Sequence, residues 1–242
     1  MTANYRTEAV GDSFVEAYAD ASDLWLRHRP QSLTVRVTDP VSEWSAVPSD
    51  RDTQLDTWRQ ALRLGDQFST IEDVSLSKTS PLTGGDTVAH WVEDRVIEQL
   101  DGGYWGQSGE AIEECIDQGL KGYPGNRRNA LIANLFDESD RQKAMKAPKV
   151  KGLPCVSHLQ FTTDFGTLGL CTTLRSQYFG LKGLGNLVAS GALLAYAARQ
   201  ADYEVGEVRE EIHNVTTHDE ENVRKIYRKL QDAEQEDELV EA

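Results

Sequence analysis

The sequence contains no apolar run that approaches the roughly 20 residues a helix needs to cross a bilayer. Its first residues, Met1 to Glu8, are polar and lack the apolar centre of a secretory signal, so we expect a cytoplasmic location. Cysteine is scarce, with only Cys115, Cys155 and Cys171, and no pair of them has a CxxC spacing. A disulfide framework or a zinc site is therefore not expected.

Positive charge is also scarce, because 40 acidic residues outnumber 25 lysines and arginines and leave a formal net charge of −15. A surface of this sign repels phosphate backbones, so nonspecific nucleic-acid binding is not expected. Such acidity is also typical of proteins from a high-salt cytoplasm. It does not exclude a small phosphorylated ligand, because a few converging arginines can reverse the local field.

The length of 242 residues and the hydrophobic content of 39% suit a single globular domain with a substantial core. Apolar periodicity and turn residues divide the chain into helices and strands. The predicted helices are Ser13–Arg27, Asp52–Leu64, Thr87–Leu100, Gly109–Leu120, Leu187–Gln200 and Asp219–Leu230. The predicted strands are Ser32–Thr38, Asn129–Phe136, His158–Thr163, Thr167–Ser176 and Val205–Val215. This mixture predicts an α+β fold in which helices pack on a mixed, largely antiparallel sheet.

Turn signals and composition assign the remaining segments. Asp164-Phe165-Gly166 stands between two strands and predicts a β-hairpin. Phe68–Thr87 is polar and rich in turn residues, which predicts a loop, and the charged segment Asp137–Gly152 is expected to be exposed. The acidic tail, residues 231–242, is expected to be disordered.

Cys155 stands at the entrance of the first hairpin strand, directly after Pro154, which restricts the backbone there. Alternation along the strand places Cys155 on the same face as Phe161 and Val156 on the other face. Arg175 ends the facing strand, and a nearby cation lowers the pKa of a thiol. Taken alone, such a cysteine is more often a small buried core residue.

A longer run of motifs surrounds this cysteine. Its members are Leu153-Pro154-Cys155, Gln160-Phe161, Leu174-Arg175-Ser176, Asn186, Glu204-Val205-Gly206, His213 and His218, with Tyr104-Trp105-Gly106 and Arg127-Arg128 upstream. Together they resemble the thymidylate synthase and pyrimidine nucleotide hydroxymethylase superfamily. In that family a Pro-Cys nucleophile is followed, at these spacings, by Gln-Phe, Arg-Ser and an asparagine. The resemblance covers about Glu93 to His218, while residues 1–86 diverge.

The resemblance implies a thymidylate synthase-like fold whose sheet forms the interface of a homodimer. It implies that Cys155 adds to C6 of a uracil ring, so that C5 becomes nucleophilic and takes a one-carbon unit from 5,10-methylenetetrahydrofolate. It assigns Glu93 to proton transfers, with Glu98 and Glu72 as substitutes. Tyr178 takes the position at which the family has an aspartate that helps to bind the folate.

The implied substrate is a pyrimidine nucleoside monophosphate, and six residues are assigned to it. Its phosphate would be held by Arg175 and Ser176, and by Arg127 and Arg128 from the neighbouring subunit, because guanidinium groups bind phosphate oxygens bidentately. The other two residues, Asn186 and His213, would contact the nucleoside. The amide of Asn186 matches the O4 and N3–H edge of uracil, whereas an aspartate would suit cytosine. His213 would lie near the sugar or near a water molecule at C4.

Several of these residues also have a plainer interpretation. Arg127 and Arg128 can be a solvated strand start, and Glu93 can be an exposed helix acid. Asn186 can cap a helix that begins at Leu187. His213 can be a structural residue of its strand.

The sequence departs from the family pattern at four motif positions, lacks a recognisable N-terminal arginine loop for the phosphate, and carries an insert, Asp137–Gly152, before the cysteine. Leu174 replaces a glutamine, Tyr178 an aspartate, Val215 a tyrosine that contacts the sugar, and Gly183-Leu184-Gly185 a Leu-Pro-Phe loop. These changes affect folate and sugar recognition and leave Cys155, Arg175 and Asn186 in place.

Three functions follow as alternatives. The first is methylation of dUMP to dTMP. The second is hydroxymethylation at C5 of dUMP, UMP, dCMP or CMP, in which water intercepts the exocyclic methylene intermediate. The third is a nucleotide-binding relative that has lost turnover.

Overall fold

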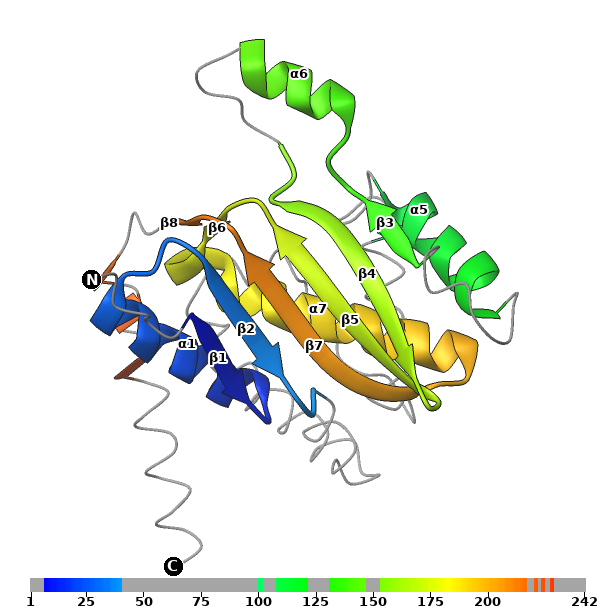
Figure 1. The fold of residues 1–242 in the computed structure, drawn as a ribbon, viewed down its shortest axis with the longest axis horizontal. Helices are drawn as coiled ribbons and strands as arrows, with labels where there is room; N and C mark the ends of the chain where they lie inside the picture. The colour runs from blue at the N-terminus through cyan, green and yellow to red at the C-terminus, as the bar shows by residue number, and fades with distance from the viewer. Residues whose placement is uncertain are drawn as a thin grey trace, which may run out of the picture.

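The computed structural model describes residues 7–40, 100–101, 108–121, 131–146 and 153–216, together with residues 220, 221, 223, 224, 227 and 228. These residues form a six-stranded sheet in the order β1-β2-β7-β5-β4-β3 (Figure 1). Its strands are β1 (Glu8–Gly11), β2 (Leu33–Val37), β3 (Ile132–Asn134), β4 (Val156–Asp164), β5 (Thr167–Leu174) and β7 (Glu204–Ile212). The β1–β2 and β5–β7 pairs are parallel, and the β2–β7, β4–β5 and β3–β4 pairs are antiparallel. The predicted α+β class with a mixed sheet is confirmed.

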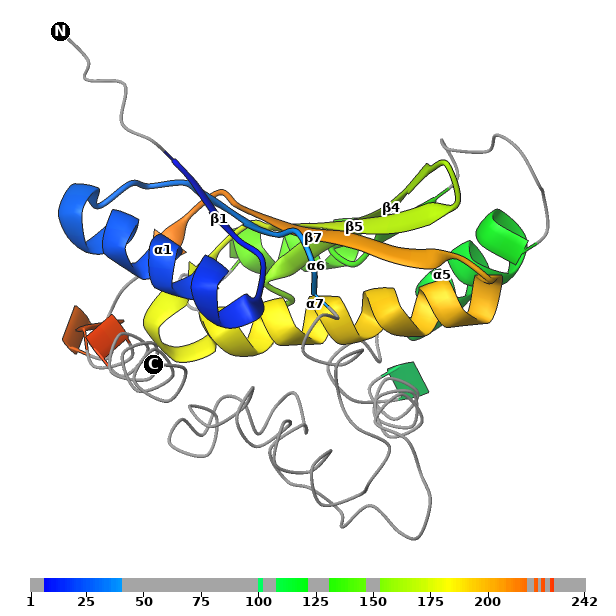
Figure 2. The same cartoon turned by 90° about the horizontal axis from the view of Figure 1, so that it is seen from below.

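Two helices, α1 (Phe14–His28) and α7 (Phe179–Ala201), lie on the same side of this sheet (Figure 2). A second, two-stranded sheet pairs β6 (Gln177–Tyr178) with β8 (Val215–Thr216) beside the start of α7. The hydrophobic core fills the space between the helices and the larger sheet, and its buried α7 side chains include Leu187, Leu193 and Ala197. Among the described residues, no helix has both the length and the apolar character that a membrane span needs.

The ends of α1 follow from local hydrogen bonds. The Oγ of Ser13 accepts from the backbone N–H of Glu16 at 3.1 Å, and the Glu16 carboxylate accepts in return from the backbone N–H of Ser13, which forms a capping box. The helix ends at Arg29, whose φ of 51° is left-handed and whose N–H donates to the carbonyl of Trp25 at 2.9 Å. The predicted helix Ser13–Arg27 is confirmed within one residue at each end.

α7 begins eight residues before the predicted start at Leu187. Glycine has a low intrinsic helix propensity. The glycines at 180, 183 and 185 therefore made the sequence before Leu187 look non-helical. Tertiary packing overrides that preference at Gly183, because a Cβ there would lie 2.8 Å from the Cε2 of Tyr18 in α1. Asn186 lies inside α7, so its interpretation as the cap of a helix starting at Leu187 is wrong.

The other described elements match the predictions in part. The predicted helix Gly109–Leu120 is divided into α5 (Gly109–Glu114) and a π-helical continuation, η3 (Cys115–Lys121). The charged segment after Asp137 contains α6 (Glu138–Lys146), whose first turn is held by the Asp137 carboxylate, which accepts from the N–H of Asp140 at 2.8 Å. The predicted strand Asn129–Phe136 is shortened to β3, and residues 220, 221, 223, 224, 227 and 228 are helical as predicted.

Several predictions fall outside the described residues. These are the helix Asp52–Leu64, the loop Phe68–Thr87, the tail from residue 231 to 242, and the helix Thr87–Leu100 except for its last residue. Leu100 is helical, in agreement with the last of these predictions, and Asp101 is helical one residue beyond the predicted end.

α7 approaches α1 most closely at Gly191, where an added Cβ would overlap the ring of Phe14. We expect Gly191→Ala to lower the free energy of unfolding by about 1–3 kcal/mol, because overpacking a core outweighs the better helix propensity of alanine. Urea unfolding followed by circular dichroism measures this change. Adding Phe14→Leu should recover part of the loss, and a single variant as stable as the parent protein would contradict the close contact.

Candidate functional site

The hairpin brings Arg175 back to the segment Pro154-Cys155. The Nε of Arg175 donates to the carbonyl of Pro154 at 2.8 Å, and its backbone N–H donates to the carbonyl of Cys155 at 3.0 Å. Its guanidinium carbon lies 5.3 Å from the centroid of the Phe136 ring. These contacts join Arg175 to the backbone of the segment that carries the half-buried Cys155, while the predicted pairing of its thiol with the guanidinium group stays a prediction.

The strand faces next to Cys155 differ from the predicted alternation. The β4–β5 register shifts between Val156 and His158, and Val156 pairs with Leu174. This bulge puts Val156 on the same core-facing side as Phe161, and both are buried. The predicted placement of Cys155 and Phe161 on one strand face is therefore wrong. The bulge contains one extra residue, so side chains before it lie on the opposite face from the one that simple alternation predicts.

His213 lies at the same edge of the sheet as Arg175. β5 and β7 run parallel, so that their C-terminal ends are neighbours, and the N–H of His213 donates to the carbonyl of Leu174 at 2.9 Å. The N–H of Gln177 donates in turn to the carbonyl of Asn214 at 3.0 Å. This bond joins the segment that follows β5 to the segment that follows β7. Cys155, Arg175 and the exposed His213 thus stand at the ends of three neighbouring strands.

The other predicted site residues follow on β6 and α7. Ser176 is half-buried between Arg175 and β6, and Tyr178 is 42% exposed at the N-cap position of α7. Asn186 is buried within α7, at 6% exposure. Glu93, Arg127 and Arg128, and the substitutes Glu72 and Glu98, lie outside the described residues.

Behind this edge lies a buried polar cluster that the sequence analysis missed. The Glu210 carboxyl group accepts from the Oγ of Ser190 at 3.1 Å and from the Nε2 of Gln177 at 3.3 Å. The hydroxyl of Thr172 lies 3.2 Å from the same Ser190 hydroxyl. All four residues are buried, and Glu210 is 1% exposed. The cluster joins β5, β6, β7 and α7.

Burial dominates the electrostatics of this cluster. It raises the pKa of Glu210 to about 7, although the hydrogen bonds from Ser190 and Gln177 oppose this effect. Tyr18 stacks on Phe179 with ring centroids 4.8 Å apart and donates its hydroxyl proton to the Phe179 carbonyl at 2.6 Å. Burial and the nearby Glu210 raise the pKa of Tyr18 strongly, so this hydroxyl keeps its proton.

A sequence signal for Glu210 did exist. Val208, Glu210 and Ile212 alternate along β7, and all three are buried on the face turned toward α7. A carboxyl group between two inward-facing apolar residues is rare unless it is hydrogen-bonded, and that pattern would have marked it as special.

The other cysteines are poor sources of a thiolate. Burial, together with the neighbouring Glu211, raises the pKa of Cys171 to about 11, so this group is a thiol at neutral pH. Burial and Glu114 also raise the pKa of Cys115. Cys171 has its own neighbouring arginine, Arg209, which opposes this rise without cancelling it, whereas the backbone of Cys155 is bonded to Arg175 at the end of the strands.

Comparison of the sequence with protein-family models and with curated proteins finds no match.

The raised pKa of Glu210 should make stability depend on pH. In the unfolded chain this group ionises near the ordinary value of 4.5, whereas in the folded protein it keeps its proton up to about pH 7. Its contribution to the free energy of unfolding is therefore complete below the ordinary pKa, decreases between these two values, and is lost above them. We expect a difference of about 3 kcal/mol across this window, and Glu210→Gln should abolish it.

Urea unfolding at a series of pH values measures how the free energy of unfolding changes with pH for the wild-type protein and for each variant. Glu211→Gln is the matched control, because Glu211 lies on the opposite strand face and is half-exposed, and it should retain the slope. An unchanged slope in Glu210→Gln would show that another group titrates.

Proposed function

We propose that the chain is a folate-dependent transferase of the thymidylate synthase type that methylates C5 of dUMP. The observation that carries this proposal is the anchoring of Arg175 on Pro154-Cys155, with His213 at the same sheet edge. The arrangement supports a nucleophilic cysteine next to a phosphate-binding arginine. It also agrees with the order and spacing of the motifs along the sequence.

In the proposed reaction the Sγ of Cys155 adds to C6 of the uracil ring, and the electron pair of the C5–C6 double bond moves toward O4. C5 then becomes the carbon that forms the new bond, and it must later lose its proton. Glu93 is assigned to these proton transfers. Elimination of Cys155 restores the ring and frees the enzyme.

Arg175 and Ser176 are assigned to the nucleotide phosphate. The Nε of Arg175 is already bonded to the Pro154 carbonyl and one Nη donates to the Leu153 carbonyl at 3.5 Å, so the guanidinium plane is oriented and its remaining N–H groups would bind the phosphate. Asn186 is assigned to the O4 and N3–H edge of the base, and His213 to the sugar side.

Tyr178 is assigned to the folate. Its side chain is 42% exposed and stands directly after Ser176 and Gln177, so its ring can lie against a flat, partly apolar group beside the nucleotide. When bound, 5,10-methylenetetrahydrofolate supplies the one-carbon unit and the reducing hydride that methylation requires.

The buried cluster supports the proposed site from behind. Glu210 binds Ser190, which lies one helical turn after Asn186, and Gln177, which lies two residues after Arg175. It also lies on β7 three residues before His213, which follows the end of that strand. We assign Glu210 to positioning Asn186, Arg175 and His213.

A homodimer is part of the proposal, with Arg127 and Arg128 reaching the active site of the neighbouring subunit. The sheet face opposite α7 is the proposed interface. It carries polar and half-exposed side chains, including the ion pairs Arg36–Glu207 at 2.8 Å and Arg209–Glu211 at 3.1 Å. Paired charges of this kind are compatible with an interface, because each charge already has a partner.

The covalent step is tested with 5-fluoro-dUMP and methylenetetrahydrofolate. Wild-type protein should gain the mass of the trapped adduct, and Cys155→Ser should not, because the alcohol is a far weaker nucleophile than a thiolate. Cys171→Ser should form the adduct as the wild type does. Intact-protein mass spectrometry measures all three.

Product analysis with dUMP, UMP, dCMP and CMP then separates the candidate reactions. A methylated product from dUMP supports the proposal, and a hydroxymethylated product replaces it with the second reaction. Nucleotide binding with neither product nor adduct would contradict catalysis by Cys155.

The shared active site makes a further prediction. Cys155→Ser and the double variant Arg127→Ala/Arg128→Ala should each be inactive. Mixing them under conditions that exchange subunits should restore about a quarter of wild-type activity, because half of the dimers are mixed and each contains one intact site. Light scattering should give twice the chain mass of 27.0 kDa. A monomer, or no recovery on mixing, would contradict the dimeric site.

A further inference from the structure

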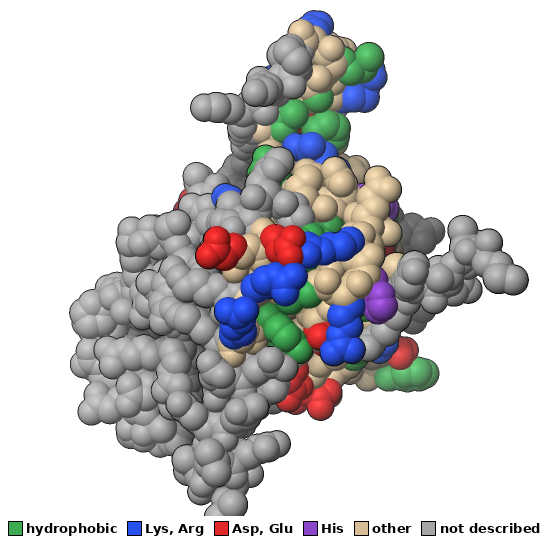
Figure 3. Space-filling view, turned by 90° about the vertical axis from the view of Figure 1, so that its left-hand side faces the viewer, with side chains coloured by type: hydrophobic (Ala, Val, Ile, Leu, Met, Phe, Trp, Pro, Cys, Tyr) green, Lys and Arg blue, Asp and Glu red, His purple; other side chains and the backbone are tan. Residues whose placement is uncertain are grey.

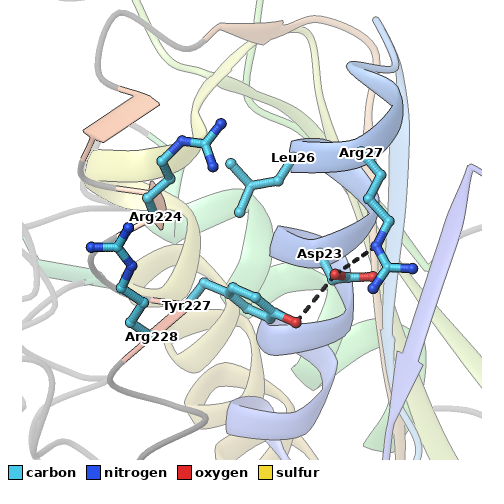
Figure 4. A pocket seen from close by; sticks show the side chains of 6 residues that line it. All are labelled: Asp23, Leu26, Arg27, Arg224, Tyr227 and Arg228. Carbon is cyan, nitrogen blue, oxygen red and sulfur yellow. Dashed lines mark hydrogen bonds and ion pairs between the residues drawn. The ribbon is translucent and has the colours of Figure 1, made fainter.

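A pocket of about 340 Å³ lies between α1 and the C-terminal helical residues (Figure 4). α1 contributes Asp23, Leu26 and Arg27 to its lining, and the C-terminal helical residues contribute Arg224, Tyr227 and Arg228. None of these residues belongs to the site proposed for the nucleotide. The pocket is therefore a separate feature of the molecule.

The charge around this pocket is opposite in sign to that of the whole chain. Three arginines and one carboxylate line it, although the formal net charge of the protein is −15. Next to it, Arg29 and Arg224 share the single carboxylate of Glu220. Figure 3 shows this side of the molecule, where α1 lies, with Lys and Arg side chains interspersed with Asp and Glu.

The arginines of the pocket differ in how they are paired. The Nε of Arg27 donates to the Oδ1 of Asp23 at 2.9 Å, and an Nη of Arg224 donates to Glu220 at 2.7 Å. Arg228 makes no ion pair and no hydrogen bond in the part of the chain that the structure describes. Arg224 and Arg228 are four residues apart, so they lie on one helix face and repel each other.

The acidic lining residue is already engaged. Asp23 accepts from the Tyr227 hydroxyl at 3.1 Å as well as from Arg27, as the dashed lines in Figure 4 show. Its charge is thus shared between two donors and opposes an incoming anion less than a free carboxylate does. Leu26 and the Tyr227 ring add apolar surface to the same pocket.

We infer that this pocket binds the phosphate group of a small phosphorylated molecule. Guanidinium forks match phosphate oxygens, and an anion bound by Arg224 and Arg228 would relieve the repulsion between them, while Arg27 stays paired with Asp23. The volume is at the lower end of the range for small-molecule pockets, which suits a compact phosphate ester. The apolar wall of Leu26 and Tyr227 would contact the body of such a ligand.

Isothermal titration calorimetry with inorganic phosphate and with ribose 5-phosphate, at low and matched ionic strength, tests the inference. Arg228→Gln is the decisive variant, because it removes a charge without breaking any ion pair in the described part of the chain. We expect it to weaken phosphate binding at least tenfold, and Arg228→Lys to weaken it less. Tighter binding of ribose 5-phosphate than of inorganic phosphate would identify an ester as the ligand.

Arg36→Gln is the control for overall charge, since it removes one half-exposed arginine on β2, paired with Glu207 and outside the pocket lining, and should leave the affinity unchanged. Equal weakening by Arg228→Gln and Arg36→Gln would overturn the inference, because it would mean that only the overall charge matters. Binding that Arg228→Gln leaves intact would place the phosphate elsewhere, for example at Arg175. Absence of binding to wild-type protein at millimolar phosphate would also overturn it.

Discussion

The register of the β4–β5 hairpin is the constraint on which the proposed site depends. Asp164 pairs with Thr167 across a two-residue turn, in which Phe165 has a φ of 44° and Gly166 a φ of 93°. Positive φ at both positions matches the right-handed twist of the strands and fixes the pairing. A slip by one residue would turn every β5 side chain to the other face and would separate Arg175 from Pro154.

The buried carboxyl group of Glu210 is a second constraint, and it acts against stability. Transfer of a carboxylate into a core is costly, so the fold keeps this group largely protonated below neutral pH and surrounds it with hydrogen-bonding partners. An apolar residue at this position would pack more simply. Retention of the acid is easier to understand if it orients Ser190 and Gln177, because perturbed titratable groups concentrate at functional sites.

The sequence predicted the parts of the fold that depend on local signals. Turn residues located the hairpin, and an apolar stripe located α1. The first part of α7 and the bulge before His158 were missed, because both depend on packing between distant segments. β1 was missed for the same reason, since its four residues form a strand only through pairing with β2.

For the site, the spacing of Cys155 and Arg175 predicted their proximity, because hairpin pairing converts sequence separation into distance. The cluster around Glu210 could not be assembled from spacing alone. Its members come from four elements, and only the parallel pairing of β5 with β7 and the packing of α7 bring them together.

The two arginine sites differ in how far they are organised before a ligand arrives. The bond from Arg175 to the Pro154 carbonyl fixes its guanidinium, so binding there loses little side-chain entropy and can orient a substrate for reaction. Arg228 has no hydrogen-bonding or ionic partner among the described residues, so a ligand would have to order it, which lowers the affinity that the same number of contacts can provide. The sheet edge is therefore suited to chemistry, and the pocket at α1 is suited to reversible binding of an anion.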